Sequence, residues 1–172
     1  LEDTSWIEPT KYAGIWWGYH IGKFSFGYPG TEDKPHGATT QRAKRYIDFA
    51  AQNNINSVLI EGWNRKLNQK EKADNDISNI SSDLRSYKKY HPDYNLNAVV
   101  QYADKHNIEI MMHNETAGQV NYYRYQLDEL YTFYCSLAIN YLKLGYAWYI
   151  ESGKYYHHSQ LVIRHYNTVI KK

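Results

Sequence analysis

Four short apolar runs in this sequence are each followed by side chains that can do chemistry. Glu61 and Glu115 carry carboxylates, which can act as general bases when they are held next to a reacting group. His113 and Lys143 carry nitrogen atoms that can donate hydrogen bonds to a polar ligand. The apolar runs that precede or adjoin these residues are Tyr12–Trp17, Ser57–Ile60, Glu109–Met112 and Ile139–Leu142.

Each apolar run is followed by a helix-like segment, which is the pattern of a parallel βα sheet. In such sheets ligands bind outside the carboxyl ends of the strands, because the βα loops converge there. The polar residues at the four strand ends are therefore expected to form one shared site. The helices are predicted to begin near Thr39 and Thr40, whose hydroxyls can cap free backbone N–H groups, and to cover Leu96–Lys105, Asn121–Phe133 and Tyr155–Lys172.

A long polar stretch, Arg65–Tyr94, separates the second apolar run from the next helix. It is rich in Asn, Asp, Ser and Lys and is too polar for a core, so it is either an elaborated βα loop or a disordered surface insertion. Four βα units are half of an eightfold barrel, which typically needs about 250 residues. The sequence predicts an α/β fold, either a complete small open sheet or a partial (β/α)8 TIM barrel of about four βα units.

Composition narrows the classes of protein to which the chain can belong. With 172 residues, 42% of them hydrophobic, the chain can build one real core. Its 20 Lys and Arg are nearly balanced by 18 Asp and Glu spread along the chain, which argues against a nucleic-acid partner. No apolar stretch predicts a membrane span or a signal peptide in this chain. The lone cysteine, Cys135, is expected to be a small buried residue.

Aromatic residues are over-used, with 19 tyrosines and five tryptophans. Sugar rings have apolar C–H faces, so an aromatic-rich chain is compatible with a carbohydrate site. Most of the tyrosines nevertheless fit amphipathic packing, with the ring buried and the hydroxyl kept near water. The tyrosines assigned to packing are Tyr87, Tyr90, Tyr94, Tyr122, Tyr123, Tyr125, Tyr131 and Tyr134.

Several motifs, in order and at matching intervals over nearly the whole chain, resemble the catalytic barrel of glycoside hydrolase family 97. The resemblance implies a calcium-dependent α-glucosidase or α-galactosidase that is periplasmic or secreted. It also implies flanking β-domains, which are absent from residues 1–172, so the chain corresponds to the N-terminal half of the barrel. The strings that carry the resemblance are Lys11–Gly18, His36–Thr40, Tyr46–Ala51, Val58–Asn64, His113–Thr116 and Lys143–Tyr146.

Glycoside hydrolysis needs one carboxylic acid to protonate the leaving oxygen and one carboxylate to activate water or attack the sugar. Glu115 is the candidate base, and the alternative for it is a surface or salt-bridged residue. The resemblance assigns substrate contact to Glu61. His113 and Lys143 are the expected hydrogen-bond donors to sugar hydroxyls, and Trp17 is the expected stacking platform. For Lys143, capping a strand end or pairing with Glu115 remains equally open.

The resemblance places the calcium ligands and the general acid outside this chain. No metal site is therefore predicted within it, and the isolated chain is expected to be inactive. Family members that retain anomeric configuration have an Asp nucleophile where this chain has Gly145. A glycine there leaves space for water, which favours an inverting enzyme acting on an α-linked oligosaccharide or glucoside. The alternative is that Gly145 only permits close packing.

Two further expectations follow from the half-barrel interpretation. A half-barrel leaves open strand edges, which template association, so the chain is expected to self-associate. A function of another class also remains open, namely a non-catalytic carbohydrate-binding or degenerate half-barrel protein.

Overall fold

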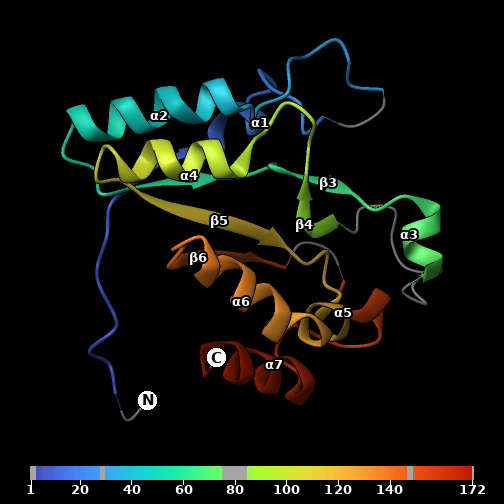
Figure 1. Ribbon diagram of the computed structural model, residues 1–172. Helices are drawn as coiled ribbons and strands as arrows, with labels where there is room; N and C mark the ends of the chain where they lie inside the picture. The colour runs from blue at the N-terminus through green and yellow to red at the C-terminus, as the bar shows by residue number, and fades with distance from the viewer. Residues whose placement is uncertain (1–2, 28–29, 75–84, 147–148, 172) are drawn as a thin grey trace.

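A four-stranded parallel sheet in the order β1-β2-β5-β6 forms the centre of the structure (Figure 1). All three strand pairs are parallel, which confirms the predicted α/β fold and the arrangement of a partial barrel. The computed structural model describes residues 3–27, 30–74, 85–146 and 149–171. The strands of this sheet are β1 (Tyr12–Ile15), β2 (Ser57–Ile60), β5 (Glu109–Glu115) and β6 (Tyr141–Gly145).

Helices α2 and α4 lie side by side on one face of the sheet (Figure 1). The predicted start of α2 is confirmed, because the Thr39 side chain accepts a hydrogen bond of 3.1 Å from the Arg42 backbone N–H. Asn95 caps α4 in the same way, by accepting from Ala98 N at 3.0 Å. The helices are α1 (Trp17–His20), α2 (Thr40–Gln52), α3 (Gln69–Asp74), α4 (Leu96–Asp104), α5 (Val120–Tyr125), α6 (Leu127–Ser136) and α7 (Gln160–Ile170), with a 3₁₀ turn, η1 (Glu151–Gly153).

The third predicted helix is in fact two helices. The predicted single span is wrong, because α5 ends and α6 begins around Gln126. The Gln126 backbone N–H donates a hydrogen bond to Tyr123 O, and its side-chain amide donates to Tyr122 O. These bonds tighten the turn and interrupt the α-helical ladder. The last helix begins at Gln160, later than predicted.

Alternate residues of the strands face opposite sides of the sheet, as the pleat requires. Ile110 and Met112 of β5 point outward into the core beneath the helices, where both are buried. His113 and Glu115 have the opposite parity, so they face the inner side. The strand continues three residues beyond the predicted Glu109–Met112, because pairing with β6 extends to Glu115 opposite Gly145.

Asn114 anchors β5 from the outer side, between two functional residues that face inward. Its side chain is fully buried, donates to Tyr123 Oη at 3.1 Å and accepts from Tyr134 Oη at 2.8 Å. The two tyrosines belong to α5 and α6. This buried network therefore ties the strand that carries His113 and Glu115 to both helices.

The polar stretch after β2 forms structure of its own in its described parts. Strands β3 (Asn64–Lys66) and β4 (Arg85–Tyr90) pair antiparallel, and residues 75–84 lie outside the described residues. Glu71 of α3 joins the hairpin through Arg65 Nη2 at 2.6 Å and Lys89 Nζ at 2.7 Å. Figure 1 shows β3, β4 and α3 beyond the end to which β5 points. The described parts of this polar stretch therefore form an elaborated βα loop.

Both outer strands have one strand partner within the described residues, β2 for β1 and β5 for β6. Self-association through these edges stays a prediction. Cys135 is exposed, so its expected burial is wrong, because α6 turns Leu127, Leu130 and Tyr134 into the core and Cys135 lies off that face. None of the described helices combines the length and apolar character needed to cross a bilayer.

Candidate active site

One row of inner-face positions at the carboxyl end of the sheet includes residues of β5 and β6 and the residues directly after β1 and β2. His113 is paired with Lys143 in the β5–β6 register. Glu61 precedes His113 along the same row, since Ile60 pairs with Met112 one position earlier. Trp16 completes the row on the β1 side, where Ile15 pairs with Ile60 and Glu61 N donates to Ile15 O at 3.3 Å.

Glu61 is the hub of contacts within this row. Its Oε1 lies 3.3 Å from His113 Nδ1, and its Oε2 lies 3.7 Å from Lys143 Nζ. The same ammonium lies 5.7 Å from the ring centroid of Trp16, within cation–π range. The carboxylate that Lys143 contacts at this distance is therefore Glu61, where the sequence had suggested Glu115 as a pairing partner.

The pKa values of Glu61 and His113 are displaced in opposite directions. Burial raises the pKa of Glu61, an effect that Lys143 opposes and the nearby charge of Glu115 reinforces. Burial lowers the pKa of His113 to about 3, with further lowering by the positive charges of Lys143 and Arg85. His113 is therefore a neutral imidazole near neutral pH. Neighbouring groups whose pKa values are shifted in opposite directions are typical of functional sites.

Glu115 lies directly over Gly145. Its Oε1 accepts a hydrogen bond of 2.8 Å from Ala117 N, which fixes the carboxylate. A Cβ atom placed on Gly145 would overlap Glu115 Oε2 and lie 2.7 Å from His113 Nε2. The position next to the glycine is thus filled by the carboxylate itself. The absence of a side chain at Gly145 therefore allows the candidate base, Glu115, to lie at this position.

Trp17 stands apart from the row. It begins α1, its side chain is 59% exposed, and its ring centroid is 5.5 Å from that of Trp16. Its role as a stacking platform stays a prediction. Sequence reasoning missed Trp16, although the alternation of β1 could have found it, because positions 14 and 16 share the inner face.

Arg85 is a second residue that sequence reasoning missed. It begins β4, is buried, and its guanidinium carbon lies 5.1 Å from the ring centroid of Phe26. Burial lowers its pKa, and the negative charge of Glu115 opposes that effect. Its place in a polar stretch without periodicity offered no signal in the sequence.

The described residues hold no cluster of three or more His, Cys, Asp or Glu side chains suited to a metal ion. The carboxylate of Glu61 is occupied by His113 and Lys143, and that of Glu115 by a backbone N–H. These residues therefore do not fit a calcium cage among themselves.

Acidic, basic and aromatic side chains gathered at the carboxyl ends of parallel strands define the active-site face of a TIM-barrel enzyme. The family model described as glycoside hydrolase 97 matches residues 16–172. The chain therefore belongs to glycoside hydrolase family 97.

Individual relatives agree with this family. The chain is 30% identical, over 65% of its own length, to 14% of a protein from Bacteroides thetaiotaomicron described as a retaining α-galactosidase. It is also similar to solved structures of a family 97 enzyme from Pseudoalteromonas sp. strain K8, at 30% identity. One is in complex with acarbose (TM-score 0.79), and an E480Q variant is in complex with panose (TM-score 0.80). The chain spans 25% of those enzymes, and they cover 98% of it.

Proposed function

We propose that this chain is the N-terminal half of the catalytic barrel of an inverting, calcium-dependent hydrolase of α-glucosides. In this proposal Glu115 is the general base that takes a proton from water. Glu61, His113 and Lys143 bind the hydroxyls of the sugar, and Trp17 stacks on a sugar ring. The general acid and the calcium ligands come from parts of the protein outside residues 1–172, and the protein acts in the periplasm or outside the cell.

The observation that carries the proposal is the packing of Glu115 over Gly145. A retaining enzyme needs a nucleophilic carboxylate that attacks the anomeric carbon. A side chain at position 145 is incompatible with the place that the Glu115 carboxylate occupies. Glu115, fixed by Ala117 N–H, is instead held as a carboxylate that can accept a proton from water. The acarbose and panose complexes of the Pseudoalteromonas enzyme support α-linked oligosaccharides as the substrate class.

The stereochemistry of the product tests the proposal. Proton NMR of an active protein that contains this chain, mixed with an α-glucoside, is expected to show β-glucose before mutarotation mixes the anomers. Initial release of α-glucose would contradict the inverting assignment. An α-galactoside measured in parallel tests the second candidate, which the description of the Bacteroides relative favours. Faster hydrolysis of the galactoside with initial release of α-galactose would replace the first proposal by the second.

The isolated chain is expected to show no turnover of an aryl α-glucoside, with or without calcium. Protonation of the leaving oxygen has no assigned group in residues 1–172, and a missing acid–base group commonly costs about 10²–10⁴-fold in rate. Release of the aryl group, followed by absorbance, is the measurement. The matched control is Glu115→Gln, which removes the proposed base. Hydrolysis by the unmodified chain that this substitution abolishes would show that the acid has been misplaced.

A further inference from the structure

The peptide groups on either side of Gly62, directly after Glu61, are held by side chains from the segment between β1 and α2. Tyr19 Oη donates to Glu61 O at 2.8 Å. His36 Nε2 lies 3.0 Å from Gly62 O. Gly62 itself has a φ of +78°, a conformation that favours glycine, and a Cβ there would lie 2.5 Å from Tyr19 Oη. The turn that follows Glu61 is therefore fixed by contacts far away in the sequence.

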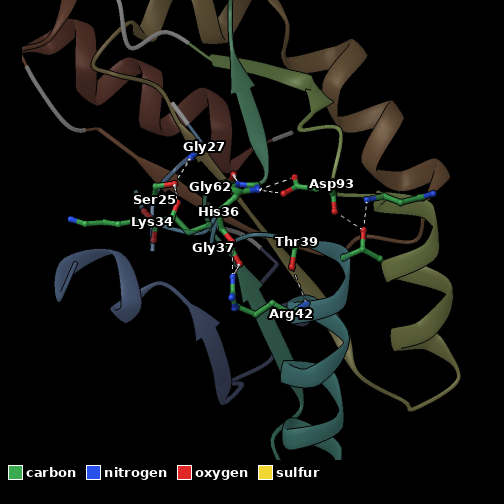
Figure 2. Close-up of polar contacts among 12 residues, drawn as sticks. Ser25, Gly27, Lys34, His36, Gly37, Thr39, Arg42, Gly62 and Asp93 are labelled. Atoms are coloured by element: carbon green, nitrogen blue, oxygen red, sulfur yellow. Dashed lines mark hydrogen bonds and ion pairs between the residues drawn. The ribbon is translucent and has the colours of Figure 1, made fainter. Parts of the chain in front are cut away.

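Both ring nitrogens of His36 face hydrogen-bond acceptors (Figure 2). Nδ1 lies 2.9 and 3.0 Å from the two carboxylate oxygens of Asp93, and Nε2 faces the Gly62 carbonyl oxygen. A carboxylate and a carbonyl only accept, and a neutral imidazole has one N–H. Both bonds can exist together only when the ring is an imidazolium. Loss of one proton must release either Asp93 or Gly62.

Charged and titratable side chains of the described residues lie near this ring. The His36 side chain is 9% exposed, and Asp93, before α4, is its anionic neighbour. His91, directly after β4, lies 4.4 Å away between ring centroids, and burial together with the charge of His36 lowers the pKa of His91 to about 4. Arg42 of α2 donates to the backbone carbonyls of His36 and Gly37 at 2.6 and 2.8 Å. Asp93 therefore supplies a negative charge that faces the ring.

We propose that His36 is a positioning residue for Glu61, and that its imidazolium form holds the Glu61–Gly62 turn in the geometry that places Glu61 against His113. The significance of this role for sugar binding rests on the proposed function. When the ring becomes neutral and keeps Asp93, the Gly62 carbonyl loses its donor. The Glu61 side chain then loses part of the backbone support that keeps it 3.3 Å from His113.

A pH titration of the unmodified chain tests the proposal without any ligand. The carboxyl ¹³C signal of Glu61 and the ring ¹⁵N signals of His36 are followed by NMR. The chemical shift of the Glu61 signal is expected to change at the pH where the His36 imidazolium becomes a neutral imidazole. This change is separate from the one caused by the titration of Glu61 itself. A Glu61 signal that stays constant while His36 titrates would overturn the proposal. So would a His36 ring that is already neutral whenever both contacts are present.

Two substitutions separate positioning from a merely structural link. His36→Gln places an amide N–H where Nε2 lies, so it can keep the bond to Gly62 and lose Asp93. His36→Asn places its amide where Nδ1 lies, so it can keep Asp93 and lose Gly62. We expect the Glu61 signal of the Gln variant to stay at the low-pH value without this change, and that of the Asn variant to stay at the high-pH value. Equal behaviour of the Asn variant and the unmodified chain would contradict positioning through Gly62.

Backbone amide spectra of both variants establish that they fold, and the titration of the unmodified chain stands independently of them. Binding of acarbose is then measured by calorimetry. We expect affinity to fall at least about tenfold in His36→Asn and less in His36→Gln, since a misplaced Glu61 carboxylate weakens its charged hydrogen bonds to the sugar. Absence of acarbose binding by the unmodified chain would count against the proposed function alone, because the change in the NMR signal does not depend on sugar. Equal affinities of the two variants would count against positioning.

Discussion

Acidification from about pH 6.5 to about pH 4 is expected to lower the free energy of unfolding of this chain by several kcal/mol. Burial is the first cause of a lowered pKa at three histidines, to about 4 for His91, about 3 for His113 and about 4 for His165. All three are at least nine-tenths buried. Each must take up a proton when the chain unfolds in acid.

The direction of this pH effect on the free energy of unfolding follows from the linkage between proton binding and folding. An unfolded histidine has a pKa of about 6.5, so between that pH and the folded pKa the unfolded chain binds more protons. The stabilising contribution is complete above about pH 6.5 and is lost as the pH falls toward the folded pKa. One pKa unit corresponds to about 1.4 kcal/mol, which makes the loss for fully buried His165 on the order of 3 kcal/mol. Glu61 acts in the opposite sense, because its pKa is raised.

His165 is the clearest position for the test, because it lies outside the candidate site. Its Nε2 lies 2.9 Å from Tyr146 Oη, and a glutamine at this position can accept a hydrogen bond from the same hydroxyl without titrating. Urea unfolding of the unmodified chain and of His165→Gln is measured at pH 7 and at pH 4.5. The difference in free energy between the two pH values is expected to be smaller in the variant by about 2–3 kcal/mol. Equal differences would refute the assignment of acid sensitivity to His165.

Gly145→Ala is expected to impair catalysis far more than stability in an active protein that contains this chain. The new methyl group overlaps Glu115 Oε2 and approaches His113 Nε2. Because Oε2 is the end of a flexible side chain, Glu115 can swing aside, with loss of its bond to Ala117 N, at a cost of about 1–3 kcal/mol of folding free energy. The proposed base then leaves its position. We expect the rate of α-glucoside hydrolysis to fall about 10²–10⁴-fold, as for removal of an acid–base group.

A double-mutant comparison makes the expectation specific. Glu115→Gln alone is expected to lose activity to a similar extent, and Gly145→Ala combined with it is expected to lose little more, because both changes remove the same function. Rates and urea unfolding are measured for all four proteins. Additive losses of activity would contradict the idea that Gly145 acts through the placement of Glu115.

The elements that the sequence predicted are those with strong local signals. β2 and the start of α2 were predicted within a residue, because an apolar run and the capping hydroxyl of Thr39 determine them locally. The hairpin of β3 and β4 was not predicted, since its pairing depends on partners distant in sequence and its residues are polar. Gln126 gave no warning of the break between α5 and α6, because the apolar spacing continues across it.

The residues of the candidate site also divide into those that a local sequence signal predicts and those that it does not. Glu61, His113, Glu115 and Lys143 follow apolar runs, and the structure brings them to one end of the sheet. Trp16 was overlooked in favour of Trp17 because the first strand was predicted two residues too long. Arg85 carries no local signal, and His36 was noted only as part of a string that resembles the family. The roles of both depend on tertiary contacts with Phe26, Asp93 and Gly62.

The anchoring of Asn114 has a consequence for alternative folded states. A slip of β5 by one residue relative to its helices would turn the Asn114 amide away from Tyr123 and Tyr134. The slip would instead turn either the His113 imidazole or the Glu115 carboxylate from the inner face toward the buried side of the strand. Such misregistered chains are therefore higher in free energy by the loss of a polar network and the burial of a polar or charged group. The outward-facing amide thereby selects which side chains the strand presents on the inner face of the sheet.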